Sequence, residues 1–198
     1  MPLRSLFLKS IEGTENIPKK SSFIITSNHE SYLDPLLIIS VIMPLINKKV
    51  HFLAKKGYFW DFFGDRLAKD WLGGISLDDG KEKALEKFVS LSKQGEITAI
   101  FIEGTESLDG NLKEGRTGTV RVALKAKIPI LPIGLIGTFN IVPGNKLLPK
   151  LKRAKMCIGK PIYLDKYYKE KINKKLLRKL TDDVMHVIST LTGKPYNY

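Results

Sequence analysis

The stretch NHESYLDP, residues 28–35, places a histidine and an aspartate five positions apart. The ordinary pKa of histidine lies near neutrality, so histidine can serve as a general base that takes the proton of a hydroxyl group. A carboxylate beside the imidazole fixes its tautomer and stabilises the imidazolium. His29 and Asp34 could therefore act together as base and orienting acid in acyl or phosphoryl transfer to an alcohol.

Both residues also have ordinary structural interpretations. Asp34 precedes Pro35, and an aspartate at the N-cap followed by proline at the first helical position is a routine helix start. His29 follows an apolar run, and a histidine at a strand end can simply bond to the backbone. The stretch by itself leaves the catalytic and the structural interpretations open.

A second polar turn, FIEGTES at residues 101–107, follows a fully apolar run. Gly104 can make a tight turn there, and Glu103 either caps that turn or faces a site beside it. In α/β proteins, sites gather beyond the carboxyl ends of strands, and both His29 and Glu103 fall at such ends. We therefore expect the two turns to meet in one cleft.

The elements that must position these side chains follow from hydrophobic periodicity. Short apolar runs alternate with helical patterns, which predicts an α/β fold with a mostly parallel or mixed sheet flanked by helices. A chain of 198 residues suits a single domain over 1–198, with a basic C-terminal portion from about residue 145. The expected strands are 22–27, 50–56, 73–77, 97–102, 128–137 and 155–164, and the expected helices are 35–46, 80–93, 117–127 and 169–191.

The net charge of +13 is unevenly spread, since residues 145–198 hold fourteen lysines and arginines against four acids. Nucleic acid, an anionic membrane surface or an acidic soluble partner could explain this excess, and a merely solvated surface is the ordinary alternative. The sequence shows no helix-turn-helix and no basic residues interleaved with exposed aromatics. We therefore expect no nucleic-acid partner.

No apolar run reaches the ~18 residues of a membrane span, and the longest, at 35–46, contains Pro44. Cys157 is the single cysteine, so no intramolecular disulfide can form and a reducing compartment is the simpler expectation. The aromatic segment 58–71 suits a membrane interface, with a core-packing helix as the other interpretation. These features predict a cytoplasmic protein.

Four stretches in order, over roughly residues 10–165, carry one combined pattern. NHESYLDP fits HxxxxD, FIEGTES fits FPEGTRS, GGISLDD stands in the place of Gly-x-Ile/Phe-x-x-x-Arg, and KAKIPILPIGLIGT has two prolines before a glycine. GTENIP, at 13–18, is similar to the segment that leads into a first strand. Together these motifs resemble the glycerolipid acyltransferase family, the 1-acylglycerol-3-phosphate (lysophospholipid) acyltransferases and their relatives, whereas HxxxxD alone would be a weak signal.

The resemblance implies an enzyme that moves a fatty acyl group from an acyl thioester, acyl-CoA or acyl carrier protein, to a hydroxyl of a lysophospholipid-like acceptor such as 1-acylglycerol-3-phosphate. It implies that His29 deprotonates the hydroxyl and that Asp34 orients His29. Glu103, Gly104 and Thr105 would then shape the acceptor pocket. No metal or bound cofactor is implied, and with the basic C-terminal portion we expect peripheral association with the inner face of the membrane.

This sequence departs from the family's pattern at two positions that matter for the acceptor, and more mildly at Ile102, where FPEGTRS has its proline. Asp79 and Glu106 stand where the family has arginines that are thought to hold the acceptor's phosphate, a change of about four charge units. Either other cations hold the phosphate, or the acceptor lacks a phosphate or carries an amine. A third hypothesis is a protein that has lost catalytic activity and only binds lipid. The replacement cations in the sequence are Arg116, within LKEGRTGTVRVAL, and Lys55, Lys56, Lys81 and Lys113.

Overall fold

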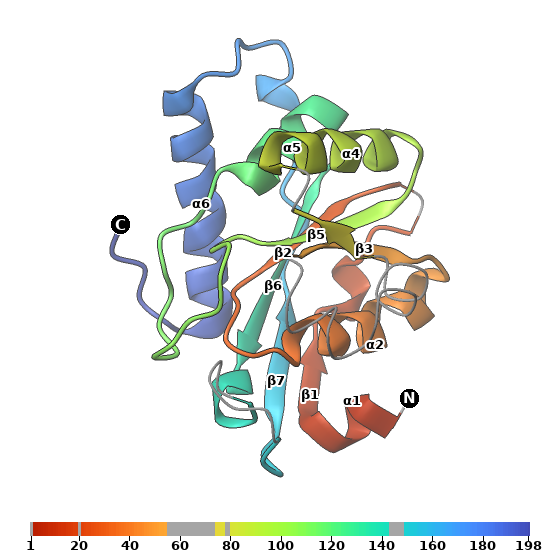
Figure 1. The fold of residues 1–198 in the computed structure, drawn as a ribbon, viewed down its shortest axis with the longest axis vertical. Coiled ribbons are helices and arrows are strands. Elements are labelled where there is room, and N and C mark those ends of the chain that lie inside the picture. Colours follow the sequence, from red (N-terminus) through yellow and green to blue (C-terminus); the bar gives the residue numbers. More distant parts are fainter. Residues whose placement is uncertain (1, 20, 55–73, 78–79, 143–148) are drawn as a thin grey trace.

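A computed structural model describes residues 2–19, 21–54, 74–77, 80–142 and 149–198 of the chain. Within them, one sheet has the strand order β1-β7-β6-β2-β5-β3-β4 (Figure 1). The strands are β1 Leu8–Glu12, β2 Ile24–Ser27, β3 Val50–Ala54, β4 Ile75–Ser76, β5 Ile97–Phe101, β6 Ile130–Ile136 and β7 Ala154–Ile158. The α-helices are α1 Pro2–Phe7, α2 Asp34–Ile46, α4 Lys81–Lys93, α5 Gly118–Ala126 and α6 Lys174–Thr192.

The sheet is mixed in direction. β6, β2, β5, β3 and β4 run parallel to one another. β7 is antiparallel to β6 and pairs on its other side with β1, which runs parallel to it. The carboxyl ends of β2 and β5 lie side by side, because Ser27 pairs with Phe101. The expected α/β fold with a mixed sheet flanked by helices is confirmed.

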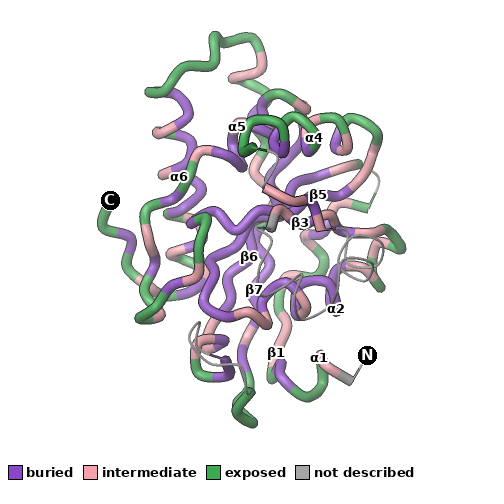
Figure 2. Tube along the Cα trace, in the orientation of Figure 1, coloured by how far each residue is buried: buried purple, intermediate pink, exposed green. Residues whose placement is uncertain are grey.

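Helices cover both faces of this sheet (Figure 1). α1 and α2 pack on one face, and α4, α5 and α6 pack on the other, which leaves the central strands buried (Figure 2). Neighbouring residues of a strand face opposite sides, so Ile25 joins the cluster under α2 while Ile24 joins the cluster under α4 to α6. Every residue of β2 and β5 is buried, as this double cover requires, and most of these residues are apolar.

The sequence did not predict α1 and β1. β1 lies at the edge of the sheet, and of its residues Leu8 is buried while the others are partly or fully exposed. Such a strand lacks the apolar run that revealed the central strands. The expected strand 155–164 also ends early, at Ile158, and Ile162 then pairs with Ile130 as an isolated bridge.

The last helix, α6, begins five residues later than expected, at Lys174. Asn173 is its N-cap, and the Asn173 side chain accepts the backbone N–H of Leu176 at 2.9 Å. Lys169 and Lys171 therefore precede the helix. The apolar periodicity predicts this helix, but it does not show that Asn173 sets the start of the helix.

The aromatic segment 58–71 lies outside the described residues. Within the parts of the chain that the structure describes, no helix combines the length and the apolarity needed to cross a membrane.

Candidate active site

The turn after β2 joins His29 directly to Asp34. The Nδ1 atom of His29 lies 3.0 Å from Oδ2 of Asp34. The same Oδ2 accepts the backbone N–H groups of Glu30 and Ser31, at 2.7 and 2.9 Å. Three hydrogen bonds therefore hold this carboxylate, which favours a proton on Nδ1 and leaves Nε2 as the nitrogen that faces outward.

Asp34 starts α2 without capping it. Leu33 occupies the N-cap position, no side chain caps the helix, and Pro35 lies in the first turn. The Asp34 carboxylate instead points back to the preceding turn, where Glu30 and Ser31 bind it. The alternative interpretation of Asp34 as a routine N-cap is therefore wrong, although the Asp-Pro helix start itself is present.

The imidazole of His29 is held against the sheet. Its ring stacks on Phe101, the last residue of β5, with ring centroids 3.8 Å apart and planes 11° from parallel. The backbone carbonyl of His29 accepts the N–H of Ser107 at 2.7 Å. His29 is 8% exposed, so little of the ring remains open to approach.

Glu103 binds the two polar turns together. Its Oε1 accepts the backbone N–H of His29 at 3.0 Å, and its Oε2 accepts that of Lys113 at 2.9 Å. Burial raises the pKa of Glu103 to about 7, although both amide hydrogen bonds and the nearby His29 and Lys113 oppose the shift. The expected meeting of the His29 and Glu103 turns is thus present, and Glu103 is the carboxylate that joins them.

A second carboxylate, Glu106, lies beside the outward nitrogen of His29. Its Oε1 is 3.4 Å from Nε2. Burial alone would lower the pKa of His29, but hydrogen bonds and charge from Asp34 and Glu106 outweigh it and raise that pKa to about 9. The hydrogen bond with His29 in turn lowers the pKa of Glu106.

The raised pKa favours an imidazolium between the two carboxylates at neutral pH. The Glu106 side chain is 31% exposed, whereas that of Asp34 is fully buried, so Glu106 is the partner that solvent reaches. A hydroxyl that is to give its proton to Nε2 must take the place of the Glu106 carboxylate. Removal of Glu106 from Nε2 would also lower the pKa of His29 and prepare it as a base.

The turn after β5 also gathers cations. Gly104 has a φ of +80°, and a Cβ built on it would lie 3.3 Å from Cγ of Arg116, so the Arg116 side chain lies along this turn. Arg116 is exposed, and no hydrogen bond or ion pair with another described residue holds its guanidinium. Lys113 Nζ donates to Thr105 Oγ1 and, at 3.3 Å, to the carbonyl of Glu106. Of the residues predicted for acceptor binding, Glu103, Gly104, Thr105 and Arg116 are thus brought together.

The remaining predicted cations are not joined to this cluster. Lys81 is the first residue of α4 and is exposed, with no ion pair to His29 or Glu106 among the described residues. Lys55, Lys56 and Asp79 lie outside the described residues.

Two contacts of His29 were not predicted from the sequence. The sequence predicts Phe101 only as part of a buried strand and Glu106 only as an acid in place of an arginine, whereas both contact the His29 ring. The strand register could have revealed the first, because the ends of β2 and β5 carry both rings to one edge. Nothing in the residue spacing indicates that Glu106 turns back toward Nε2.

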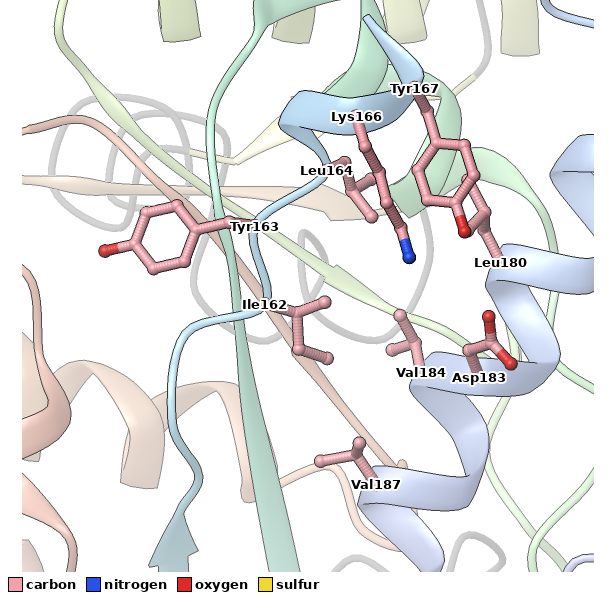
Figure 3. Close-up of a pocket in the computed structure, with 9 residues that line it drawn as sticks. All are labelled: Ile162, Tyr163, Leu164, Lys166, Tyr167, Leu180, Asp183, Val184 and Val187. Carbon is pink, nitrogen blue, oxygen red and sulfur yellow. The ribbon is translucent and has the colours of Figure 1, made fainter.

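A separate pocket of about 180 Å³ lies between residues 162–167 and α6 (Figure 3). Ile162 pairs with Ile130, which pairs with Ile24 at the start of β2, whereas His29 follows the end of that strand. The pocket therefore lies toward the opposite end of the sheet. None of the residues predicted for the site lines it.

Comparison with known proteins bears on the chemistry of the His29 turn. Residues 10–136 match a family model described as Acyltransferase. The chain is 30% identical over 155 residues to the 1-acyl-sn-glycerol-3-phosphate acyltransferase of Bacillus subtilis, an alignment that covers 77% of this chain and 73% of that protein. It is also 30% identical over 165 residues to the chloroplastic 1-acyl-sn-glycerol-3-phosphate acyltransferase BAT2 of Brassica napus, with 77% of this chain and 44% of that protein covered.

A solved structure has the same fold. The crystal structure of the 1-acyl-sn-glycerophosphate (LPA) acyltransferase PlsC from Thermotoga maritima matches with a TM-score of 0.71 and 25% sequence identity. The match covers 97% of this chain and 76% of that one. Several curated relatives are longer proteins, of which this chain spans about half, between 43% and 54%.

Proposed function

The chain belongs to the acyltransferase family, and from this premise we propose that it transfers a fatty acyl group from an acyl thioester to a hydroxyl of 1-acylglycerol-3-phosphate or a closely related lysophospholipid. The observation that carries the proposal is the hydrogen-bonded pair of His29 and Asp34, with Nε2 of His29 turned outward. The similarity to 1-acyl-sn-glycerol-3-phosphate acyltransferases supports this class of acceptor.

The proposed reaction uses the pair in two proton steps. Neutral His29 takes the proton of the acceptor hydroxyl at Nε2 while the oxygen attacks the thioester carbonyl, and Asp34 stabilises the imidazolium that forms. The tetrahedral intermediate then breaks its C–S bond, and the proton on Nε2 passes to the departing sulfur. An ester and a free thiol are the products, so the proton balance closes without a metal ion. The thiol carrier is CoA or acyl carrier protein.

Glu106 holds the resting state in this scheme. Its carboxylate occupies the approach to Nε2, and an incoming acceptor hydroxyl displaces it. The displacement removes a negative charge from the imidazole and so favours the neutral base at the moment when the substrate is bound.

Recognition of the acceptor's phosphate falls to Arg116 and Lys113. Arg116 is an exposed cation on the turn that carries Glu103 and Glu106, and Lys113 Nζ lies on Thr105 of the same turn. An arginine binds a phosphate through two parallel hydrogen bonds, so one such residue supplies both charge and geometry. These two cations thus stand in for the arginine that residue 106 lacks.

Replacement of Arg116 by alanine is expected to raise the KM for 1-acylglycerol-3-phosphate by about tenfold, with a smaller change in kcat, because it removes binding that is common to ground state and transition state. Initial rates of acyl transfer at varied acceptor concentration measure this. Arg121→Ala is the matched control, since Arg121 is already paired with Glu82 at 2.6 Å. An unchanged KM in Arg116→Ala, or a preference of the wild-type protein for an amine-bearing or phosphate-free acceptor, would contradict phosphate recognition at this turn.

We also propose that the protein meets its substrate as a peripheral protein on the inner, anionic face of a membrane. The exposed lysines that could adsorb there surround the start of α6. Arg178 is different, because it is bound internally to Asp182, Glu114 and the carbonyl of Gly115. The exposed lysines are Lys169, Lys171, Lys174, Lys175 and Lys179.

Each such lysine contributes about 1 kcal/mol near an anionic surface at modest salt. Co-sedimentation with phosphatidylglycerol vesicles is therefore expected to fall steeply when salt rises from about 50 mM to about 500 mM, because the Debye length shortens. Binding to vesicles of neutral phosphatidylcholine is the control. Binding that does not change with salt would contradict the role of the lysines and indicate an interaction through apolar side chains. An absence of binding at low salt would contradict the membrane proposal.

A further inference from the structure

A buried carboxylate follows His29 directly in the chain. Glu30 is 1% exposed, and its Oε1 accepts a hydrogen bond from the Asn28 side chain at 2.7 Å. Burial raises the pKa of Glu30, while its hydrogen bond and charge pairing with Lys194 oppose that shift. A charge buried this deeply is stable only when it is paired, so the partner of Glu30 is important for the turn.

That partner comes from the far end of the chain. Lys194 Nζ forms an ion pair with Glu30 Oε1 and also donates to the carbonyl of Gly110. Lys194 is the first residue beyond Gly193, which ends α6 in the left-handed conformation with its N–H on the carbonyl of Ser189 at 2.8 Å. The end of α6 thus places the ammonium group within the His29 turn.

The other side of the turn is fixed to the sheet. Asn28 Nδ2 donates to the carbonyl of Leu135 at 2.9 Å, and Asn28 Oδ1 accepts the N–H of Leu135 at 2.8 Å. His29 lies between Asn28, which β6 holds, and Glu30, which Lys194 holds. The N–H of Glu30 is in turn one of the donors to Asp34 Oδ2.

We infer that Lys194 is a positioning residue for the catalytic pair, acting through Glu30 to hold the Glu30 amide on Asp34 and thereby Asp34 on His29. The role of Lys194 in acyl transfer rests on the proposed function, whereas the contacts among Lys194, Glu30 and Asp34 do not depend on that function. Without Lys194, the unpaired Glu30 carboxylate turns toward water or takes up a proton, and the amide that anchors Asp34 moves with it. The hydrogen bond between Asp34 and His29 then weakens.

The pKa of His29 reports on this hydrogen bond and is measured by NMR titration of the imidazole nitrogens, without any substrate. Among the residues that the structure describes, the charged groups that face His29 are Asp34, Glu103 and Glu106. In Lys194→Met, the His29 pKa is expected to fall by about one unit as the support of Asp34 weakens, which is opposite in sign to the rise that loss of a nearby cation alone would cause. Lys194→Arg keeps the charge and the hydrogen-bond donors, so its His29 pKa is expected to stay close to the wild-type value. Lys93→Met is the control at an exposed lysine at the end of α4.

A double-mutant comparison tests whether Lys194 acts through Glu30. In the Glu30→Gln background, Lys194→Met is expected to leave the His29 pKa unchanged, because the ion pair is already gone. If Lys194→Met alone does not fold, Lys194→Gln takes its place in both backgrounds, with the same expected results. A lower melting temperature with an unmoved His29 pKa in Lys194→Met would overturn the inference, as would a further shift in the Glu30→Gln background. Because the titration needs no turnover, its outcome is separate from any failure of acyl transfer by the wild-type protein.

Discussion

Replacement of His29 by alanine is expected to lower kcat/KM for acyl transfer by about 10³-fold, because a positioned general base contributes about 10²–10⁴-fold. In the proposed reaction Nε2 of His29 accepts the proton, and Asp34 holds this imidazole through Nδ1. Transfer of a labelled acyl group from an acyl thioester to 1-acylglycerol-3-phosphate measures the loss. The kcat/KM of Asp34→Asn is expected to lie between those of the wild-type protein and His29→Ala, because this variant keeps His29 but weakens its orientation.

The matched control is His186→Ala, because His186 is an exposed histidine on α6 whose ring contacts Tyr196. It is expected to retain wild-type turnover. His29→Ala is expected to keep binding to anionic vesicles, which separates a lost base from a lost fold. If His29→Ala transfers acyl groups as fast as the wild-type protein, His29 is not the base and the proposed mechanism is wrong.

Replacement of Glu106 by glutamine is expected to raise kcat/KM near pH 7 by about tenfold. The pKa of His29 stands at about 9 in the resting protein, with Asp34 and Glu106 as the carboxylates that raise it. At pH 7 a group with a pKa of about 9 is neutral in roughly one molecule in a hundred. Loss of one carboxylate lowers that pKa by about one unit, which makes the neutral base about ten times more abundant.

The pH profile of kcat/KM gives the sign of this effect, because it reports the pKa of the free enzyme's base. In the wild-type protein kcat/KM is expected to rise with pH until about 9, and in Glu106→Gln the same limb moves to lower pH. Glu86→Gln, an exposed carboxylate of α4, is the control. A profile of Glu106→Gln that overlays the wild-type profile, or that moves to higher pH, would contradict the resting-state role of Glu106.

The elements of the fold that leave a local pattern in the sequence could be predicted from it. β2 and β5 are buried along their whole length because helices cover both faces of the sheet, and the largely apolar runs that result are visible in the sequence. Their carboxyl ends are neighbours in any parallel pairing, so the meeting of the His29 and Glu103 turns also follows. β1 was not predicted, because an edge strand that is half exposed lacks that signal.

The contacts that tune the site depend on long-range packing and were not predictable. The Glu106 carboxylate reaches Nε2 of His29 across 77 positions of sequence, and its side chain could equally have pointed to water. Lys194 reaches Glu30 across 164 positions because α6 runs along β6 and ends beside the His29 turn. A sequence pattern identifies the groups that can do chemistry, whereas the partners that set their pKa values come from the assembled fold.

The central claim, acyl transfer through His29, is tested most directly by mass spectrometry of lipids after the wild-type and His29→Ala proteins meet an acyl thioester and 1-acylglycerol-3-phosphate. The account predicts that the wild-type protein converts the acceptor to the diacyl product and releases one thiol per acyl group, while His29→Ala forms about 10³-fold less product. Absence of the diacyl product with the wild-type protein, or equal amounts with both proteins, would contradict it.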